Sequence, residues 1–243
     1  MKAIILAAGY AQRLYPLTKD KSKALLHIAG KPIISHIVSS LSEIDVIDKI
    51  FVVTNQKFYE DFAKWKELKK LENVEIINDG TTDNDTRLGA IGDIDFVIRE
   101  KNIDDDILII AGDNFFTFDL ADFYEFYRKA GHDCVCADIT HDIELLKGFA
   151  TAFTNEYGVI TELVEKAPEP KSDLAIYAIY IYTKETVSLF EEYLNLKNSP
   201  DAPGYFLQWL HKIKDVYAYK IQGEIVDIGT FESLKSARER FGE

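Results

Sequence analysis

Basic residues gather in the opening stretch of the chain, directly after an apolar run that ends in glycine. The run KAIILAAG covers residues 2–9. Before any helical pattern begins, the chain then carries Arg13, Lys19, Lys21, Lys23 and Lys31. A strand, a glycine turn and several cations suit a polyphosphate, because backbone N–H groups, arginine and lysine can hold it together. A solvated basic loop would show the same residue types, so both interpretations stay open here.

The turn itself matches neither of two common nucleotide-binding motifs. Residues 9–13 read GYAQR, so Ala11 stands where the dinucleotide fingerprint G-x-G-x-x-G has its second glycine. No Gly-Lys followed by Ser or Thr comes after it, which excludes the P-loop pattern. If residue 11 needs a positive φ, an alanine there is strained by about 1 kcal/mol.

Two aspartates follow apolar runs that read as buried strands. Asp113 comes directly after DILIIAG (residues 106–112), and Asp227 stands in EIVDIGT, where Thr230 can cap a following helix. Ligands of open α/β sheets bind at the carboxyl ends of the strands. Two carboxylates at such ends could meet around one Mg²⁺ and a triphosphate. Each aspartate could equally serve as an ordinary turn or cap residue.

A Glu–Lys pair ends another strand pattern. Glu165 and Lys166 stand in LVEKAPEP, just before Pro168. The lysine could be a charge on an edge strand, or it could point into the same cleft as the two aspartates.

Strand and helix patterns alternate through the first half of the chain. Strands are predicted at 2–8, 49–54, 73–78 and 106–112, and helices at 33–41, 58–68 and 86–100. Near-continuous apolar strands of this kind belong to parallel sheets that are covered on both faces. We therefore expect a doubly wound α/β unit.

The second half changes character and adds mixed strands to the same sheet. The patterns predict a helix at 119–130, a strand at 133–139, a hairpin turning at 155–158, a strand at 174–183, helices at 184–196 and 204–213, a strand at 215–221 and a last helix from about residue 230. No linker-like or repetitive segment divides the chain, so one domain is expected.

Composition argues against a polymer partner. The chain has 243 residues, with 28 Lys and Arg against 41 Asp and Glu and a formal net charge of -13. Such a charge is a poor match to nucleic acid, whereas cations collected in one loop suit a small anion. No apolar run is long enough to cross a bilayer, and Met1 leads straight into a strand pattern. We expect a soluble, cytoplasmic protein that binds neither nucleic acid nor membrane.

The only two cysteines, Cys134 and Cys136, lie two residues apart in a strand pattern. Residues at this spacing share one face of a strand, and no second ligand pair for zinc follows. We interpret them as reduced core thiols.

In combination, the motifs resemble those of the sugar-1-phosphate nucleotidyltransferases. That family carries L-A-A-G-x-G-x-R-L-x-P-L-T, then P-K-x-L-L-P and G-K-P. The corresponding stretches here are LAAGYAQRLYPLT (6–18), SKALLHI (22–28), GKPI (30–33), AGDN (111–114), VEKAP (164–168) and VDIGT (226–230). The order is the same, and the resemblance covers essentially the whole chain.

The resemblance implies an α/β, Rossmann-like nucleotidyltransferase fold. Its three α/β/α layers enclose a mixed, mostly parallel central sheet. It further implies one domain over residues 1–243, with a nucleotide-binding half (1–115), a sugar-phosphate-binding half (116–243) and no C-terminal β-helix. The implied reaction joins a nucleoside triphosphate to a sugar 1-phosphate, or a similar phosphorylated small molecule, and releases pyrophosphate. Mg²⁺ would assist an in-line attack on the α-phosphate. A homo-oligomer is compatible with the resemblance.

The resemblance also implies roles for individual residues. Arg13 would hold the leaving pyrophosphate, and Lys23 would contact the α-phosphate. The nucleotide would be bound by Leu6, Ala7, Ala8, Gly9, Ala11, Arg87 and Gly112. The sugar phosphate would be bound by Glu165, Lys166 and Tyr180, and the metal by Asp113 and Asp227.

Several positions depart from the family pattern. Besides Ala11, the two prolines around Lys23 are replaced by Ser22 and His27, and Ala178 stands where a glycine is common. Arg87 occupies a position that is small in relatives. It could contact phosphate or base, or pair with one of the nearby aspartates, Asp83 or Asp85.

Because of these departures, two alternatives remain beside an NDP-sugar-forming enzyme. One is a cytidylyltransferase that uses phosphocholine or a polyol phosphate as the acceptor. The other is a catalytically silent relative that serves as a regulatory subunit.

Overall fold

A central sheet of nine strands runs through both halves of the molecule. The computed structural model describes residues 1–243. In the first half, four parallel strands lie side by side in the order β6-β1-β4-β5. Their bounds are β1 Lys2–Leu6, β4 Lys49–Thr54, β5 Val74–Asn78 and β6 Ile107–Ala111. All four patterns were predicted as strands, and their carboxyl ends meet at one edge of the sheet.

The second half extends this sheet mainly with antiparallel pairs. Strand β11 (Leu174–Tyr182) pairs with β6 and so joins the two halves. Strands β8 (Asp133–Ile139) and β9 (Ala150–Thr154) both pair with β11. The sheet is completed by β10 (Ile160–Glu165) next to β9 and by β12 (Val216–Lys220) next to β8. The predicted hairpin corresponds to β9 and β10.

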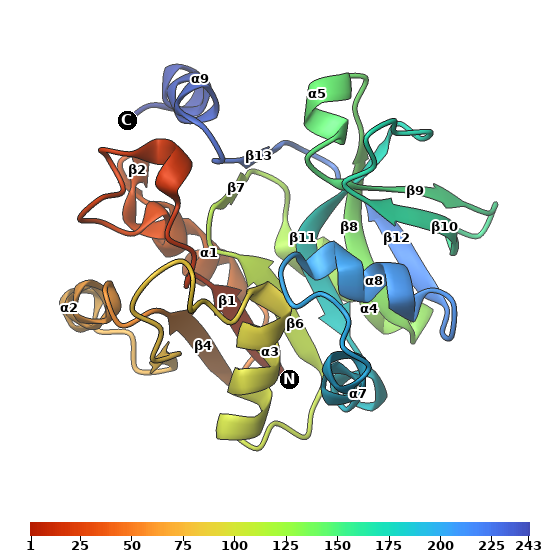
Figure 1. The fold of residues 1–243 in the computed structure, drawn as a ribbon, viewed down its shortest axis with the longest axis horizontal. Coiled ribbons are helices and arrows are strands. Elements are labelled where there is room, and N and C mark those ends of the chain that lie inside the picture. The colour runs from red at the N-terminus through yellow and green to blue at the C-terminus, as the bar shows by residue number, and fades with distance from the viewer.

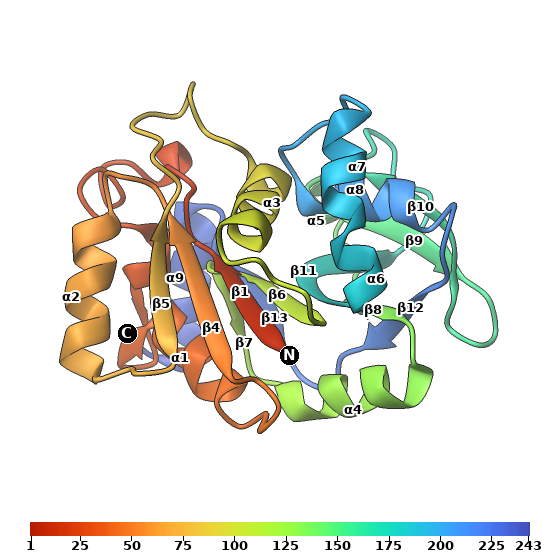
Figure 2. The ribbon, with the colours of Figure 1, turned by 90° about the horizontal axis from the view of Figure 1, so that it is seen from below.

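Helices cover both faces of the sheet, and this confirms the predicted three-layer α/β class. Figure 2 shows α1, α4 and α9 on one side of the strands and α3, α7 and α8 on the other. The bounds on the first side are α1 Ile33–Leu41, α2 Tyr59–Lys69, α4 Leu120–Ala130 and α9 Phe231–Phe241. On the second side they are α3 Ala90–Glu100, α6 Lys184–Val187, α7 Leu189–Asn195 and α8 Pro203–Leu210. A short helix, α5 (Ile143–Leu146), precedes β9.

Two small ribbons lie outside the main sheet, and neither pairing was predicted. In one, β2 (His27–Ile28) pairs with β3 (Lys31–Pro32). In the other, β7 (Asn114–Phe116) pairs antiparallel with β13 (Ile225–Asp227). Figure 1 shows β7 and β13 side by side between the two halves. The second ribbon joins segments more than one hundred residues apart, and both contain or adjoin a candidate metal ligand.

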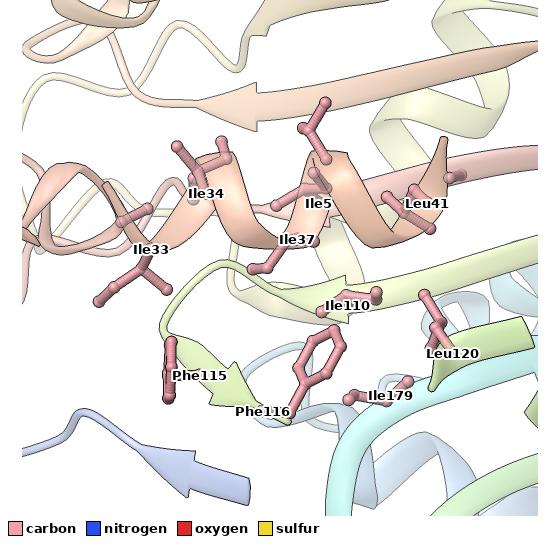
Figure 3. Close-up of a cluster of buried hydrophobic side chains, with 14 of the residues drawn as sticks. Ile5, Ile33, Ile34, Ile37, Leu41, Ile110, Phe115, Phe116, Leu120 and Ile179 are labelled. Atoms are coloured by element: carbon pink, nitrogen blue, oxygen red, sulfur yellow. The ribbon is translucent and has the colours of Figure 1, made fainter. Parts of the chain in front are cut away.

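Apolar side chains fill the space between each helical layer and the sheet. On one side, Ile33, Ile34, Ile37 and Leu41 of α1 are buried, and Figure 3 shows this helix near Ile110 of β6 and Phe116 of β7. Ile34, Ile37 and Leu41 follow one another at intervals of three and four residues, which places them on one face of an amphipathic helix. Cys134 and Cys136 are fully buried free thiols in this same core, as the sequence predicted.

Two boundaries and one buried position differ from the sequence patterns. Helix α3 begins at Ala90 and not at residue 86, because Gly89 has a φ of 81° and cannot join the helix. The predicted helix at 184–196 is divided into α6 and α7 at Ser188. The apolar spacing of Phe58, Phe62, Trp65 and Leu68 predicted one helix face at 58–68, yet the side chain of Leu68 is 81% exposed.

No helix of the structure combines the length and apolar character that crossing a bilayer requires.

Candidate active site

The loop after β1 presents a row of unused backbone donors. The backbone N–H groups from Ala8 to Ala11 donate no hydrogen bond within the protein. The carbonyl groups of this loop, in contrast, are held in place: Asn55 Nδ2 donates to Ala8 O at 2.8 Å, and Thr54 Oγ1 donates to Ala7 O. Because the acceptors are fixed and the donors are free, the loop is arranged to bind an anion such as phosphate.

Ala11 has the positive φ under which the sequence analysis expected strain for an alanine. Its φ and ψ are 46° and 42°. Thr18 Oγ1 donates a hydrogen bond of 2.7 Å to Ala11 O, and Leu14 N–H donates to the same oxygen at 3.0 Å. The loop therefore keeps the geometry that glycine would adopt freely, and the strain expected for an alanine is present.

Gly112 allows the end of β6 to approach this loop closely. Its N–H donates to Leu6 O at 2.8 Å, and a Cβ on residue 112 would stand 2.8 Å from that same oxygen. A side chain at residue 112 would therefore push β6 away from the loop and move Asp113, which follows directly.

Lys23 and Asp113 form an ion pair at the carboxyl end of β6. Lys23 begins the short 3₁₀ helix η2 (Lys23–Leu25), and its Nζ contacts Asp113 Oδ2. Burial disfavours the charge of Lys23, but the attraction of Asp113 and Asp227 outweighs it and raises the pKa of the lysine. Lys23 therefore stays charged, although only 17% of its side chain is exposed.

The ribbon of β7 and β13 brings Asp227 to the same place. Asp227 is paired in register with Asn114, the neighbour of Asp113, and Ile228 N–H donates to Asp113 O at 3.1 Å. Burial, and then the like charge of Asp113, raise the pKa of Asp227 to about 7, whereas Lys23 and Arg13 act in the opposite direction. Arg13 lies in η1 (Gln12–Leu14) and extends its Nη2 toward Gly229. Four residues predicted from separate motifs thus converge.

The pair Asp113 and Asp227 has the chemistry of a partial metal site. Two hard carboxylates repel each other here, and a divalent cation between them would offset that repulsion. No group of three or more ligating side chains exists. This arrangement fits Mg²⁺, which usually takes one or two protein carboxylates and completes its shell with water and phosphate oxygens.

Glu165 and Lys166 end β10 next to helix α8. The side chain of Glu165 is 5% exposed, whereas that of Lys166 is half-exposed, with its Nζ 3.8 Å from Glu165 Oε1. Burial raises the pKa of Glu165 to about 7, and the charge of Lys166 partly opposes this. Lys166 has a φ of 50° and donates its N–H to Phe149 O, which turns its side chain out of the strand pattern.

Helix α8 was not expected to contribute to this region, yet two of its residues hold Glu165. Gln208 Oε1 accepts the backbone N–H of Glu165 at 2.8 Å. Gly204 leaves the space that the carboxylate fills, because a Cβ on residue 204 would stand 1.9 Å from Glu165 Oε2. A glycine after Pro203 in a helix start was the only sequence signal for this contact.

Strand β11 places its two candidate residues differently. The pairing of β11 with β8 shifts register between Ile176 and Tyr180. Ala178 lies in this irregular stretch and is only half-buried. Its carbonyl oxygen accepts a hydrogen bond from Asn114 Nδ2 at 3.4 Å. Tyr180 is 2% exposed, and its ring stacks on Tyr182 in the core. Tyr180 was predicted to bind the sugar phosphate. Its ring packs into the core, and its role toward the acceptor stays a prediction.

Arg87 pairs with a residue that sequence reasoning did not consider. Its Nη1 donates to Asn84 O at 2.7 Å, and its Nη2 lies 3.2 Å from Asp201 Oδ1 rather than on Asp83 or Asp85. The backbone strengthens the same connection, because Asp201 O accepts the N–H of Ala90 at the start of α3. The segment before α3 is thus tied to the segment before α8.

The remaining departures lie around Lys23. Ser22 is buried, at 2% exposure. His27 is exposed on β2, and its backbone oxygen accepts a hydrogen bond from Arg238 Nε. The His27 ring forms no hydrogen bond with Lys23, Asp113 or Asp227.

Comparisons with known proteins found relatives that match along the whole chain. A UTP–glucose-1-phosphate uridylyltransferase of Haloferax volcanii is 29% identical over 262 residues, which cover 100% of this chain and 97% of that protein. The bifunctional protein GlmU of Methanocaldococcus jannaschii is 30% identical over 94% of this chain, but the match covers 51% of GlmU. The chain thus spans about half the length of several other relatives.

Solved structures show the same fold. A Bacillus anthracis protein assigned as a glucose-1-phosphate thymidylyltransferase has a TM-score of 0.85 and 26% identity, with 100% of this chain and 96% of that chain covered. A UDP-glucose pyrophosphorylase has a TM-score of 0.79 at 22% identity, which shows the fold alone. The model of the nucleotidyl transferase family matches residues 2–242. The chain belongs to the nucleotidyl transferase family.

Proposed function

We propose that the protein transfers a nucleotidyl group from a nucleoside triphosphate to a sugar 1-phosphate, giving an NDP-sugar and pyrophosphate. The observation that carries the proposal is the convergence of Arg13, Lys23, Asp113 and Asp227 beside a loop with free backbone N–H groups. Similar proteins named as uridylyl-, guanyl-, adenylyl- and thymidylyltransferases of sugar phosphates support the acceptor class.

The chemistry of the proposed reaction demands this collection of charges. The attacking phosphate oxygen and the α-phosphorus are both surrounded by negative charge, which resists their approach. Lys23 beside the α-phosphate offsets that repulsion, and Arg13 stabilises the charge that moves onto the leaving pyrophosphate. Asp113 and Asp227 would hold Mg²⁺, which supplies further charge neutralisation when bound. In-line positioning replaces any covalent intermediate on the protein.

The nucleotide and the acceptor would occupy different elements. The loop from Leu6 to Ala11, together with Gly112 and Arg87, would bind the nucleotide. Lys166 would hold the phosphate group of the acceptor. Glu165 would accept hydrogen bonds from the hydroxyl groups of the acceptor sugar. We infer that residues 1–115 and 116–243 act as one domain, because β11 of the second half pairs directly with β6 of the first.

The test is release of pyrophosphate. The protein is incubated with Mg²⁺ and one of UTP, dTTP, ATP, GTP or CTP, against a panel of sugar 1-phosphates, phosphocholine and polyol phosphates. We expect release with at least one sugar 1-phosphate, and loss of release in EDTA. Release only with CTP and a non-sugar acceptor would instead support a cytidylyltransferase. No release with any pair would support a silent relative.

A further inference from the structure

The carboxyl groups of Asp79 and Asp93 lie within hydrogen-bonding reach of each other, away from the residues described so far. Asp79 follows β5, and Asp93 stands in the first turn of α3 with 6% exposure. Asp79 Oδ2 and Asp93 Oδ1 are both buried, and neither accepts a hydrogen bond from an N–H or O–H group of the protein. Both oxygens are acceptors only while ionised, so each lacks a donor.

No cation compensates this pair. Neither Asp79 nor Asp93 takes part in an ion pair, whereas Asp95 on the same helix binds Arg99 Nε at 2.8 Å. Tyr10 is the other titratable group next to the pair, and Asp83 in turn acts on Tyr10; neither carries a positive charge. Two facing negative charges without a cation would be costly, because Asp93 is buried. One proton shared between the carboxyl groups removes both the repulsion and the missing donor.

The pair is connected to the nucleotide loop through a single residue. Thr81 donates its N–H to Asp79 Oδ1 at 2.7 Å. The hydroxyl of Thr81 lies 3.2 Å from the hydroxyl of Tyr10, which precedes Ala11 in the loop. Gln56, which follows β4, donates its N–H to Thr81 O at 3.0 Å and so fixes the backbone of Thr81. Tyr10 itself is 5% exposed, so its ring is packed inside the protein and not in solvent.

We propose that Asp93 keeps a proton at neutral pH and donates it to Asp79, and that this bond positions Thr81 and Tyr10 at the nucleotide loop. Asp93 is thus a positioning residue for nucleotide binding, a role that rests on the proposed function. Ionisation of Asp93 would place two negative charges side by side and release the turn that carries Thr81.

Burial and the charge of Asp79 support the proposal in the same direction. Burial, and then Asp79, raise the pKa of Asp93 to about 8, and burial also raises the pKa of Asp79. The folded protein therefore binds this proton more tightly than the unfolded chain. Stability from the shared proton is full below the unfolded pKa near 4 and is lost as the pH rises toward 8.

The first experiment tests the shared proton without any substrate. Guanidinium unfolding of the wild type, Asp93→Asn and Asp95→Asn is measured from pH 5 to 9. Asparagine can donate to Asp79 at every pH, so the folding constant of Asp93→Asn relative to wild type should rise by up to roughly tenfold per pH unit below pH 8 and level off above it. Asp95→Asn should run parallel to wild type. If Asp93→Asn also runs parallel, no proton is shared and the proposal fails.

The second experiment tests the positioning role. Calorimetric affinities for UTP, dTTP, ATP, GTP and CTP with Mg²⁺ are measured at pH 7 and 9. We expect the best nucleotide to bind the wild type roughly five- to tenfold more weakly at pH 9, and Asp93→Asn to bind equally well at both values. Asp95→Asn should behave as wild type.

The outcomes separate this role from the proposed function. An equal loss of affinity in wild type and Asp93→Asn would overturn the positioning role while leaving the proposed function intact. Absence of nucleotide binding by the wild type at either pH would overturn both. Asp79→Asn serves as a second variant, because it too removes the repulsion and should give the pH-independent affinity of Asp93→Asn.

Discussion

Gly204 of α8 and Glu165 of β10 are in such close contact that residue 204 has no space for a side chain. A Cβ there would stand 1.9 Å from Glu165 Oε2 and 3.2 Å from the Cβ of Ala150. The contact is made by residues 39 positions apart, and it fixes the carboxylate that we assign to the acceptor. Because a single added methyl group would displace the carboxylate, residue 204 is the most direct position at which to test that assignment.

Gly204→Ala should weaken the acceptor site. An alanine normally stabilises a helix relative to glycine by about 1 kcal/mol, but here the methyl group displaces the carboxylate and should cost about 1–3 kcal/mol of unfolding free energy. The acceptor KM should rise while the nucleotide KM stays unchanged. In a Glu165→Ala background the same substitution should be neutral or stabilising. An additive cost in the double variant would show that Glu165 does not cause the effect.

Acceptor binding should depend on pH through Glu165. Its pKa is raised to about 7 by burial, against the opposing charge of Lys166. Since an ionised carboxylate accepts hydrogen bonds more strongly, the acceptor KM should rise roughly three- to tenfold between pH 8 and 6. Because glutamine does not titrate, the change in acceptor KM that remains in Glu165→Gln comes from the acceptor phosphate itself. A pH profile of Glu165→Gln that matches wild type would assign the whole change to the acceptor.

The same raised pKa has a consequence for stability, with the opposite pH trend. A carboxyl group whose pKa is higher in the folded protein stabilises it below the unfolded value of 4.5, and this contribution is lost as the pH rises toward 7. Glu165→Gln should therefore gain stability relative to wild type between pH 5 and 7, as measured by denaturant unfolding.

Asp113→Asn and Asp227→Asn should each reduce turnover by roughly a hundredfold or more, because each removes one of two proposed metal ligands. The fold should stay intact. Since neutralising one of two facing carboxylates also removes a repulsion, the Tm of Asp227→Asn should not fall. Asp45→Asn, an exposed position without an ion pair, controls for the loss of one negative charge. Near-normal turnover in either site variant would exclude the metal assignment.

Ala11→Gly should relieve strain in the nucleotide loop. Ala11 has a φ of 46°, which costs an alanine about 1–2 kcal/mol, whereas the added freedom of glycine in the unfolded chain costs about 0.5–1 kcal/mol. We expect a small net gain in unfolding free energy. Ala63→Gly, in the interior of α2, is the matched control and should lose about 1 kcal/mol. Equal losses at both positions would show that Ala11 is unstrained.

The candidate site could be predicted to the extent that its residues lie in local motifs. Arg13, Lys23, Asp113 and Asp227 each follow a strand or turn that hydrophobic periodicity reveals, and family resemblance assigned them roles. Their convergence was inferred from the rule that ligands bind at strand ends. The geometry came from the pairing of β7 with β13, two strands of three residues that lie more than one hundred positions apart.

Tyr180 and Arg87 show where local patterns do not suffice. Tyr180 matched a family position, but the side of a strand that faces the core depends on pairing register, and β11 has an irregularity between Ile176 and Tyr180. Arg87 was compared with the aspartates nearest in sequence, and its partner Asp201 lies 114 positions away.

The sequence by itself determined the α/β class, the order of most elements and the chemistry of the opening loop, because periodicity and turn residues act over a few neighbours. Only the tertiary structure decided which groups share an environment. The left-handed Ala11, the glycine at 204 beneath Glu165 and the uncompensated pair Asp79 and Asp93 all depend on contacts or burial. Desolvation and the absence of a partner arise only when distant segments pack together, and no local pattern records them.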